Sequence, residues 1–305
     1  MRLVVLLFAG ARVPGDAVGT WGSELVLAVQ QWGAGEYLLS TFLVFIQAAM
    51  LNRLAIRQSL TGELNLFPGL CYILLTALHP AFTGISSILL ANTFVLVALG
   101  YLFDALKKER QNETRFLAGL WLAVTALLYT PYIVLVIFGL IAISMLKTIK
   151  IKDVFQYMTG YITPFFIGWM LRFIFTSDLN PGIRDMIGDL GLPGFEPINQ
   201  IADIVAFSII GLILLICLLG YSQIISRKNI HARKKIDIMY ALIFFAASMV
   251  FFSPALTVQI LMTLMIPLAL FVAILLRMIR HPAIAESIHF ILFVAALLTQ
   301  ALMLV

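Results

Sequence analysis

Ten long apolar segments divide this chain, and they constrain its fold more than any other feature. A helix needs about 20 apolar residues to cross the hydrocarbon core of a bilayer, and each segment approaches or exceeds that length. Each segment is therefore predicted to be a transmembrane helix. The segments cover residues 36–51, 66–82, 85–106, 115–130, 131–147, 154–176, 200–225, 236–253, 256–276 and 284–305.

The overall composition excludes a water-soluble domain. Hydrophobic residues make up 62% of the 305 positions and charged residues 11%, with a mean hydropathy of +1.04. Soluble domains are about 45–50% apolar and about 25% charged. The fold class that follows is an all-α polytopic transmembrane bundle of about 10 to 11 helices. It forms a single integral membrane domain over residues 1–305.

The basic residues predict how the chain is oriented. All but four of the 20 Lys and Arg residues fall on one side of the predicted helices. By the positive-inside rule that side is the cytoplasm, which places the N-terminus in the cytoplasm and the C-terminus on the outer side. The net charge of +5 is then explained by anionic lipid headgroups, and no nucleic-acid partner is expected. The four exceptions are Arg2, Arg12, Arg172 and Arg184.

The first residues contain a shorter apolar run. Residues 3–11, LVVLLFAGA, would cover about half a bilayer at 1.5 Å per residue. We interpret this run as the outer half of a first helix that is incomplete at its N-terminus. A short re-entrant or interfacial segment is the alternative. Two outer loops follow from this topology, at residues 14–35 and 177–199, and any chemistry outside the bilayer is expected there.

Asp16 and Arg172 are candidate site residues near the outer face. Asp16 follows the first apolar run on a Pro-Gly turn, where a carboxylate could act as a general base or ligate a divalent cation. A solvated loop acid is the alternative. Arg172 lies four residues before the outer end of its segment, and an ionisable group inside a span marks a functional site by default. Snorkelling of its guanidinium to headgroup phosphates is the competing interpretation.

His79 and Asn92 are candidates inside the predicted outer half. His79 precedes Pro80 and could serve as a base or donate to a phosphate, because histidine titrates near neutrality. A structural role at a helix end is the alternative. Asn92 could bond a substrate hydroxyl or a neighbouring helix. No metal cluster is recognisable, and Cys71 and Cys217 are interpreted as small buried hydrophobes.

Residues 65–131 carry a resemblance to a known family. A Phe-Pro helix entry with a tyrosine, a Leu-Ala-Asn-X-Phe segment and a Phe-X-X-Gly helix ending near Tyr-X-Pro succeed one another. In these features the chain resembles an uncharacterised family of polytopic inner-membrane proteins of Bacteroidota, which implies the bacterial inner membrane as its location and a periplasmic C-terminus. The matching residues are Phe67, Pro68, Tyr72, Leu90, Ala91, Asn92, Phe94, Phe116, Gly119, Tyr129 and Pro131.

A looser likeness is to the GT-C glycosyltransferases, which use polyprenyl-phosphate sugars. They are similar in having a cytoplasmic N-terminus, about 8 to 13 helices, a long first outer loop and an acid just after the first helix. Asp16 occupies that place, although Ala17 follows it where the class commonly has a second acid. The likeness implies membrane lipids and a polyprenyl-phosphate-linked sugar as partners. It implies no cofactor beyond a divalent cation.

The leading hypothesis is therefore a transferase of envelope glycan or lipid-linked sugar metabolism that acts at the outer face. Asp16 would be its base or cation ligand, and Arg172, His79 and Asn92 would bind the donor phosphate or substrate. A transporter or flippase is the first alternative, with helix breaks expected in the stretch from Gly160 to Gly168. A scaffold subunit that binds envelope protein partners is the second.

Overall fold

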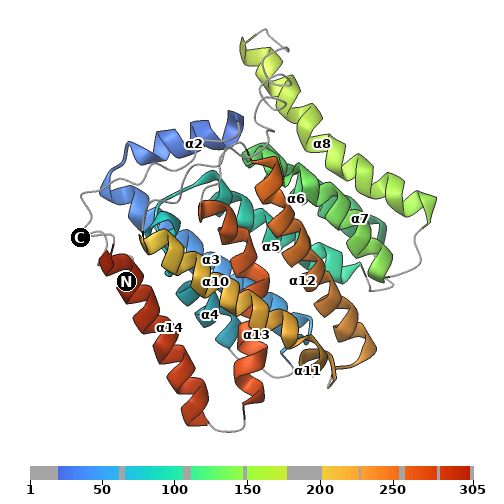
Figure 1. The fold of residues 1–305 in the computed structure, drawn as a ribbon. Coiled ribbons are helices and arrows are strands. Elements are labelled where there is room, and N and C mark those ends of the chain that lie inside the picture. Colours follow the sequence, from blue (N-terminus) through green and yellow to red (C-terminus); the bar gives the residue numbers. More distant parts are fainter. Residues whose placement is uncertain are drawn as a thin grey trace.

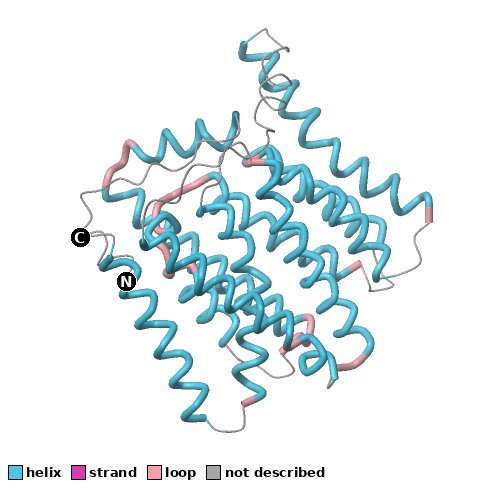
Figure 2. Tube along the Cα trace, viewed as in Figure 1, coloured by secondary structure: helices cyan, strands magenta, loops and turns pink. Residues whose placement is uncertain are grey.

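The computed structural model describes residues 20–61, 66–105, 111–146, 150–176, 201–226, 228–253, 258–279 and 282–302. Every regular element in these ranges is a helix, as the tube in Figure 2 shows. The all-α fold class is thus confirmed. The helices lie side by side as one bundle, and α2 lies across one of its ends (Figure 1).

Each of the ten predicted segments contains a helix. Several of the helices begin or end in a 3-10 turn. Their bounds are α2 Thr20–Gln30, α3 Ala34–Arg57, α4 Phe67–Leu75, η1 Pro80–Phe82, α5 Ser87–Asp104, α6 Gln111–Leu128, η2 Thr130–Val134, α7 Leu135–Leu146, α8 Ile151–Thr176, α10 Ile201–Leu219, α11 Tyr221–Ser226, α12 Ile230–Ser248, η3 Met249–Phe252, η4 Val258–Leu264, α13 Met265–Met278 and α14 Pro282–Leu302.

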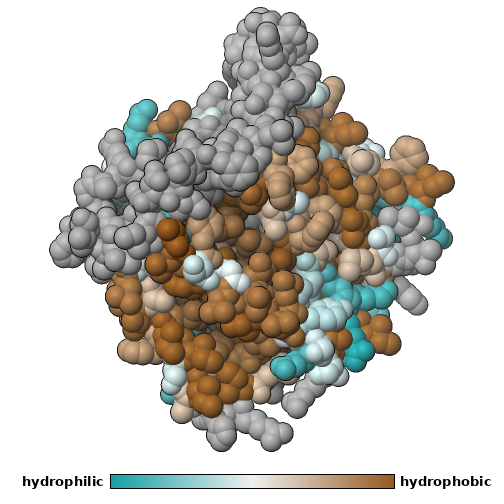
Figure 3. All heavy atoms as spheres, in the orientation of Figure 1, coloured by the Kyte–Doolittle hydropathy of each residue, from teal (hydrophilic) through white to brown (hydrophobic). Residues whose placement is uncertain are grey.

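Length and hydropathy identify this as a multi-pass membrane protein. Among the described residues, five helical stretches are long and apolar enough to cross a bilayer, and the remaining predicted segments form helices that are shorter or less apolar. Apolar side chains cover most of the face in Figure 3, with polar ones gathered near α11 and the start of α12. The five stretches are Gly35–Arg57, Ser87–Asp104, Ile230–Phe252, Val258–Met278 and Ala283–Gln300.

Two predicted segments differ from the structure. The segment 66–82 is α-helical only to Leu75, and the short turn η1 follows before α5 begins at Ser87. Conversely, α8 runs without interruption through Pro164, in the stretch where the transporter alternative expects a break. The helix breaks therefore lie at 76–86, in η2 and around η3 and η4.

Helices α6 and α8 approach each other closely because both carry glycine at the contact. A methyl group at Gly119 would collide with the carbonyl oxygen of Tyr157, and one at Gly160 with that of Phe116. Small residues at a helix contact let two backbones approach, which is how membrane helices gain packing energy without a hydrophobic driving force. Gly119 belongs to the motif noted in the sequence, and its role is thus a packing one.

Several of the described basic residues lie at one end of the bundle, which we call the basic end. Arg57 of α3 pairs with Asp104 of α5 at 2.6 Å. Lys235 of α12 donates to the side chain of Gln58 at 2.7 Å. Arg277 of α13 donates to the carbonyl oxygen of Thr61 at 2.9 Å. These contacts tie the ends of four helices together, so several of the basic residues also hold the bundle.

Candidate functional site

The most elaborate polar structure lies at the opposite end, around the stretch 76–86 between α4 and α5. Thr299 of α14 donates its hydroxyl to the carbonyl oxygen of Leu78 at 2.5 Å, and Gln300 donates its amide to that of Ala77 at 3.0 Å. Non-helical backbone at membrane depth has no water to bond and needs such partners. The last turns of α14 therefore donate hydrogen bonds to two backbone carbonyl oxygens just after the end of α4.

Helix α3 secures the other half of the same stretch. The hydroxyl of Ser40 donates to the carbonyl oxygen of Thr83 at 2.5 Å. A carboxylate oxygen of Glu36 accepts from the backbone N–H of Ile85 at 3.2 Å. Residues 76–86 are thus held from two sides, and their irregular path is satisfied by side chains rather than by solvent.

His79 lies at the centre of this stretch and is only 2% exposed. Its Nε2 lies 2.8 Å from Oδ1 of Asp203, near the start of α10, and its Nδ1 accepts from the backbone N–H of Ala81 at 3.1 Å. This pattern assigns the proton of a neutral imidazole to Nε2, which donates it to Asp203. Both ring nitrogens are engaged, so His79 connects α10 to the turn η1.

Asn92 belongs to a second buried group, formed by α5, η2 and η4. The hydroxyl of Tyr132 donates to Oδ1 of Asn92 at 2.7 Å and lies 2.5 Å from the hydroxyl oxygen of Thr263. The ring of Tyr129 packs edge-on against Tyr132, with centroids 5.4 Å apart, and its hydroxyl lies 3.1 Å from that of Ser253. Hydroxyl and amide groups thus connect the helix breaks at η2, η3 and η4.

Two side-chain atoms on α5 and η4, elements that contribute to this second group, are buried and have no hydrogen-bond partner among the described residues. They are Nδ2 of Asn92, a donor, and Oε1 of Gln259, an acceptor. Leaving such a group unpaired costs about 1–3 kcal/mol. Native proteins tolerate few of them, and each calls for an explanation such as a ligand or water that binds there. We call Asn92, Tyr132, Gln259 and Thr263 the amide–hydroxyl cluster.

The structure brings only some of the predicted site residues into view. Asp16 lies outside the described residues. Arg172 lies in the last two turns of α8, but its side chain is outside the description as well. His79 and Asn92 are both buried and bonded, each within its own group. The predicted meeting of Asp16, His79 and Arg172 therefore stays a prediction.

Asp203 is a site residue that was not predicted from the sequence. Its only local signal is that it is an acid at the start of a long apolar segment, the position where an acid also suits the positive end of the helix dipole. The pairing with His79 spans 124 residues. Within the described residues no group of three or more His, Cys, Asp or Glu residues could hold a metal ion. Cys71 and Cys217 are buried and free.

Most residues of the motif found between residues 65 and 131 lie in the interior of the bundle. Tyr72 is fully buried and donates its hydroxyl to Gln47 at 2.6 Å, and Gln47 in turn donates to Thr93 at 2.8 Å. Asn92 and Tyr129 belong to the buried groups described above. The motif residues thus take part in the packing of α3, α4, α5 and α6. They also include polar side chains that this packing buries.

Comparison with known proteins gives one assignment. Neither the curated proteins nor the solved structures contain a significant match to this chain. A family described as a family of unknown function, DUF6427, matches residues 27–304. The match includes all the helices from α3 to α14, and hence both buried polar groups. The chain therefore belongs to the DUF6427 family.

Proposed function

We propose that this protein binds a lipid-linked sugar in the bacterial inner membrane and acts on it at the outer face, as a GT-C-like transferase of envelope glycan metabolism. Its basic end would face the cytoplasm and its C-terminus the periplasm, in accord with the positive-inside rule. The family resemblance to inner-membrane proteins of Bacteroidota supports the same location.

The amide–hydroxyl cluster is the observation that carries this proposal. A sugar offers hydroxyls that both donate and accept hydrogen bonds. Nδ2 of Asn92 lacks an acceptor and Oε1 of Gln259 lacks a donor among the described residues, so the two atoms together complement such a ligand. The 3-10 turns η2 and η4 interrupt the α-helical backbone beside it. A polar ligand here would repay the cost of two buried, unpaired atoms.

The proposal gives the predicted site residues distinct roles. Asp16 acts as general base or cation ligand, and Arg172 binds the phosphate of the donor lipid. His79 is a positioning residue, because both of its ring nitrogens already hold the stretch 76–86 and Asp203. Asn92 binds a sugar hydroxyl through its amide N–H groups, because the Tyr132 hydroxyl bonds only its amide oxygen.

A Gln259→Leu variant tests the proposal directly. Because Oε1 of Gln259 has no partner, its replacement by leucine is expected to leave the thermal stability unchanged or slightly higher. Binding of a radiolabelled polyprenyl-phosphate hexose to the protein in nanodiscs is expected to fall by about tenfold, the loss of roughly one hydrogen bond.

A Tyr161→Phe variant is the matched control. The hydroxyl of Tyr161 is also buried without a partner among the described residues, but it lies on α8, away from the amide–hydroxyl cluster. Binding of the labelled lipid is expected to stay at the wild-type level. Equal binding by the wild type and Gln259→Leu would remove the proposed sugar site.

A transporter or flippase is the second candidate, and the helix breaks favour it. Discontinuous helices form the substrate sites of many transporters, and here three breaks surround the buried polar groups. Vesicles loaded with a doubly labelled polyprenyl-phosphate sugar distinguish the two: a transferase separates the sugar label from the lipid label, whereas a flippase moves both to the other leaflet. A scaffold subunit would do neither and would recover a stoichiometric envelope partner in mild detergent.

A further inference from the structure

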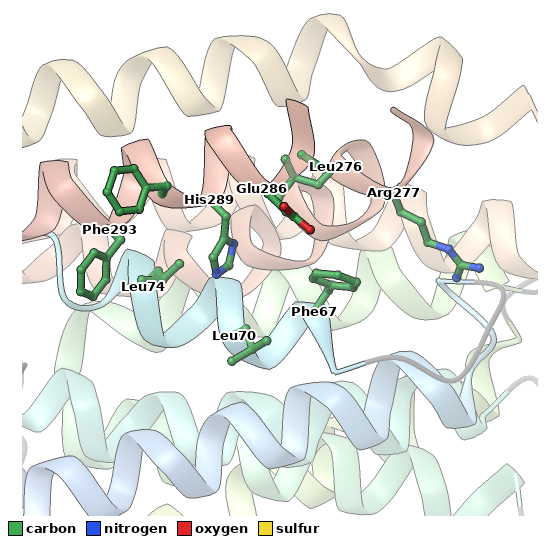
Figure 4. Close-up of a pocket in the computed structure, with 10 residues that line it drawn as sticks. Phe67, Leu70, Leu74, Leu276, Arg277, Glu286, His289 and Phe293 are labelled. Carbon is green, nitrogen blue, oxygen red and sulfur yellow. The ribbon is translucent and has the colours of Figure 1, made fainter. Parts of the chain in front are cut away.

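A cavity of about 590 Å³ lies at the basic end, between α4, α13 and α14. Figure 4 shows its walls, in which aromatic and aliphatic side chains of α4 face those of α14. Phe67, Leu70 and Leu74 form one wall, and Phe290 and Phe293 form the other. Such a lining suits an acyl chain, since it offers apolar contact along its length.

Two ionisable residues of α14 line the same cavity. Glu286 and His289 are three residues apart, which places them on one face of the helix. They lie within the apolar stretch Ala283–Gln300, only 17% of which is buried inside the protein. An ionisable side chain inside such a stretch is costly and marks a functional site by default. Both side chains project toward α4 in Figure 4.

These two residues have unmet bonding capacity. Glu286 forms no ion pair with any described residue, and its side chain is exposed. Nδ1 of His289 is buried and has no hydrogen-bond partner among the described residues. A carboxylate accepts hydrogen bonds, and Nδ1 of a neutral imidazole accepts one when the proton is on Nε2. The part of the cavity beside Glu286 and His289 therefore suits a donor that carries positive charge.

Arg277, at one end of the residues labelled in Figure 4, brings the opposite charge to the same cavity. Arg277 lines it and donates one N–H to the carbonyl oxygen of Thr61 at 2.9 Å. Burial, and then the positive charge of Arg277, lower the pKa of the neighbouring Lys228 from its ordinary value. Positive charge is thus concentrated at this point, and an anion such as a phosphate would be stabilised by it.

We propose that this cavity binds a phospholipid whose headgroup carries both a phosphate and a primary ammonium, as phosphatidylethanolamine does. The guanidinium of Arg277 pairs with the phosphate, Glu286 and His289 accept from the ammonium, and one acyl chain lies between α4 and α14. Charge complementarity selects this occupant. A purely anionic lipid would set its charge against Glu286, and a choline headgroup has no N–H to donate. The site is independent of the proposed sugar site, which lies at the opposite end.

Lipid retention tests the assignment. The protein is reconstituted in vesicles of equal parts phosphatidylethanolamine, phosphatidylglycerol and phosphatidylcholine, then extracted in mild detergent, and the retained lipid is quantified per protein by mass spectrometry. The wild type is expected to retain phosphatidylethanolamine selectively. Glu286→Gln and His289→Ala are each expected to lower that retention by about tenfold, because the first removes the negative charge that faces the ammonium and the second removes the imidazole.

Arg53→Gln is the matched control, since Arg53 lies at the basic end but outside this cavity. Its phosphatidylethanolamine retention should equal that of the wild type, and unchanged gel-filtration profiles establish that the variants fold. Phe293→Ala changes only the apolar wall and should weaken retention while preserving headgroup selectivity. Unchanged retention in both Glu286→Gln and His289→Ala would overturn the proposal, as would equal retention of phosphatidylglycerol or preferential retention of an added polyprenyl phosphate.

Discussion

The imidazole of His79 donates to the carboxylate of Asp203 across 2.8 Å, although 124 residues separate them in the chain. This bond joins the stretch between α4 and α5 to the start of α10. The carboxylate is 20% exposed while the imidazole is 2% exposed, so the pair reaches from the interior toward the surface of the bundle. It fixes two otherwise distant parts of the fold relative to each other.

Replacing Asp203 by alanine should destabilise the protein. The change leaves the Nε2–H of His79 buried without an acceptor, which costs about 1–3 kcal/mol. Thermal unfolding in detergent measures the loss. A double-mutant cycle with His79→Ala should give a coupling energy of at least about 0.5 kcal/mol, and strictly additive effects would show that the two side chains do not stabilise each other. Asp237→Ala, which removes an exposed bond to Tyr221, should change stability by no more than about 0.5 kcal/mol.

Tyr132→Phe should cost about 1–3 kcal/mol of folding free energy. Its hydroxyl serves both Asn92 and Thr263, and its loss leaves buried polar atoms unpaired. Tyr161→Phe removes a hydroxyl that has no partner among the described residues, so the same chemical change there should be close to neutral. Melting curves of the two variants, compared side by side, check this contrast. Equal losses of stability in the two variants would mean that the hydrogen bonds of the Tyr132 hydroxyl contribute nothing to folding.

Gly119→Ala should separate α6 from α8. The added methyl group meets the backbone of Tyr157 and cannot be accommodated by a rotamer change, so overpacking should cost about 1–3 kcal/mol. Gly211→Ala on α10 is the control, because a methyl group there meets no atom within 4 Å. The control should be neutral or slightly stabilising, since alanine favours helix over glycine. A melting temperature for Gly119→Ala equal to that of the control would contradict the close contact.

Cysteine labelling should reveal the orientation of the bundle. Trp32 lies near the end of the bundle that α2 crosses and is 66% exposed, and Ile230 lies at the basic end and is 71% exposed. With the basic end in the cytoplasm, an impermeant maleimide should label Trp32→Cys in intact spheroplasts and Ile230→Cys only after lysis. Cys71 and Cys217 are buried and should contribute little background. The reverse pattern would invert the proposed topology.

Hydropathy alone located a helix in each of the ten apolar segments, because a membrane span must be long and apolar whatever it packs against. Helix α2 lies outside those segments. The ends were harder to predict. Segment 66–82 reads as one apolar run, yet its helix stops at Leu75, since Thr299 and Gln300 bond the backbone beyond that point. Thr299 and Gln300 are more than two hundred residues away in the sequence, so no local pattern near Leu75 predicts these bonds.

The polar groups illustrate the same limit. His79 and Asn92 stood out because each is polar within an apolar segment, and both proved to be buried and bonded. Their partners were not apparent, because Asp203 and Tyr132 are unremarkable in their own segments. A contact between residues so distant in the chain depends on helix packing. Hydropathy identifies the spans but carries no information about which spans are neighbours.

The bonds from α14 to the stretch 76–86 also set an order of assembly. Leu78 and Ala77 are synthesised more than two hundred residues before Thr299 and Gln300, the side chains that bond their carbonyl oxygens. During synthesis this bend therefore stays incompletely bonded until α14 has entered the membrane. The hairpin of α4 and α5 becomes native only when α14 packs against it, so an element made early in synthesis depends on one made much later.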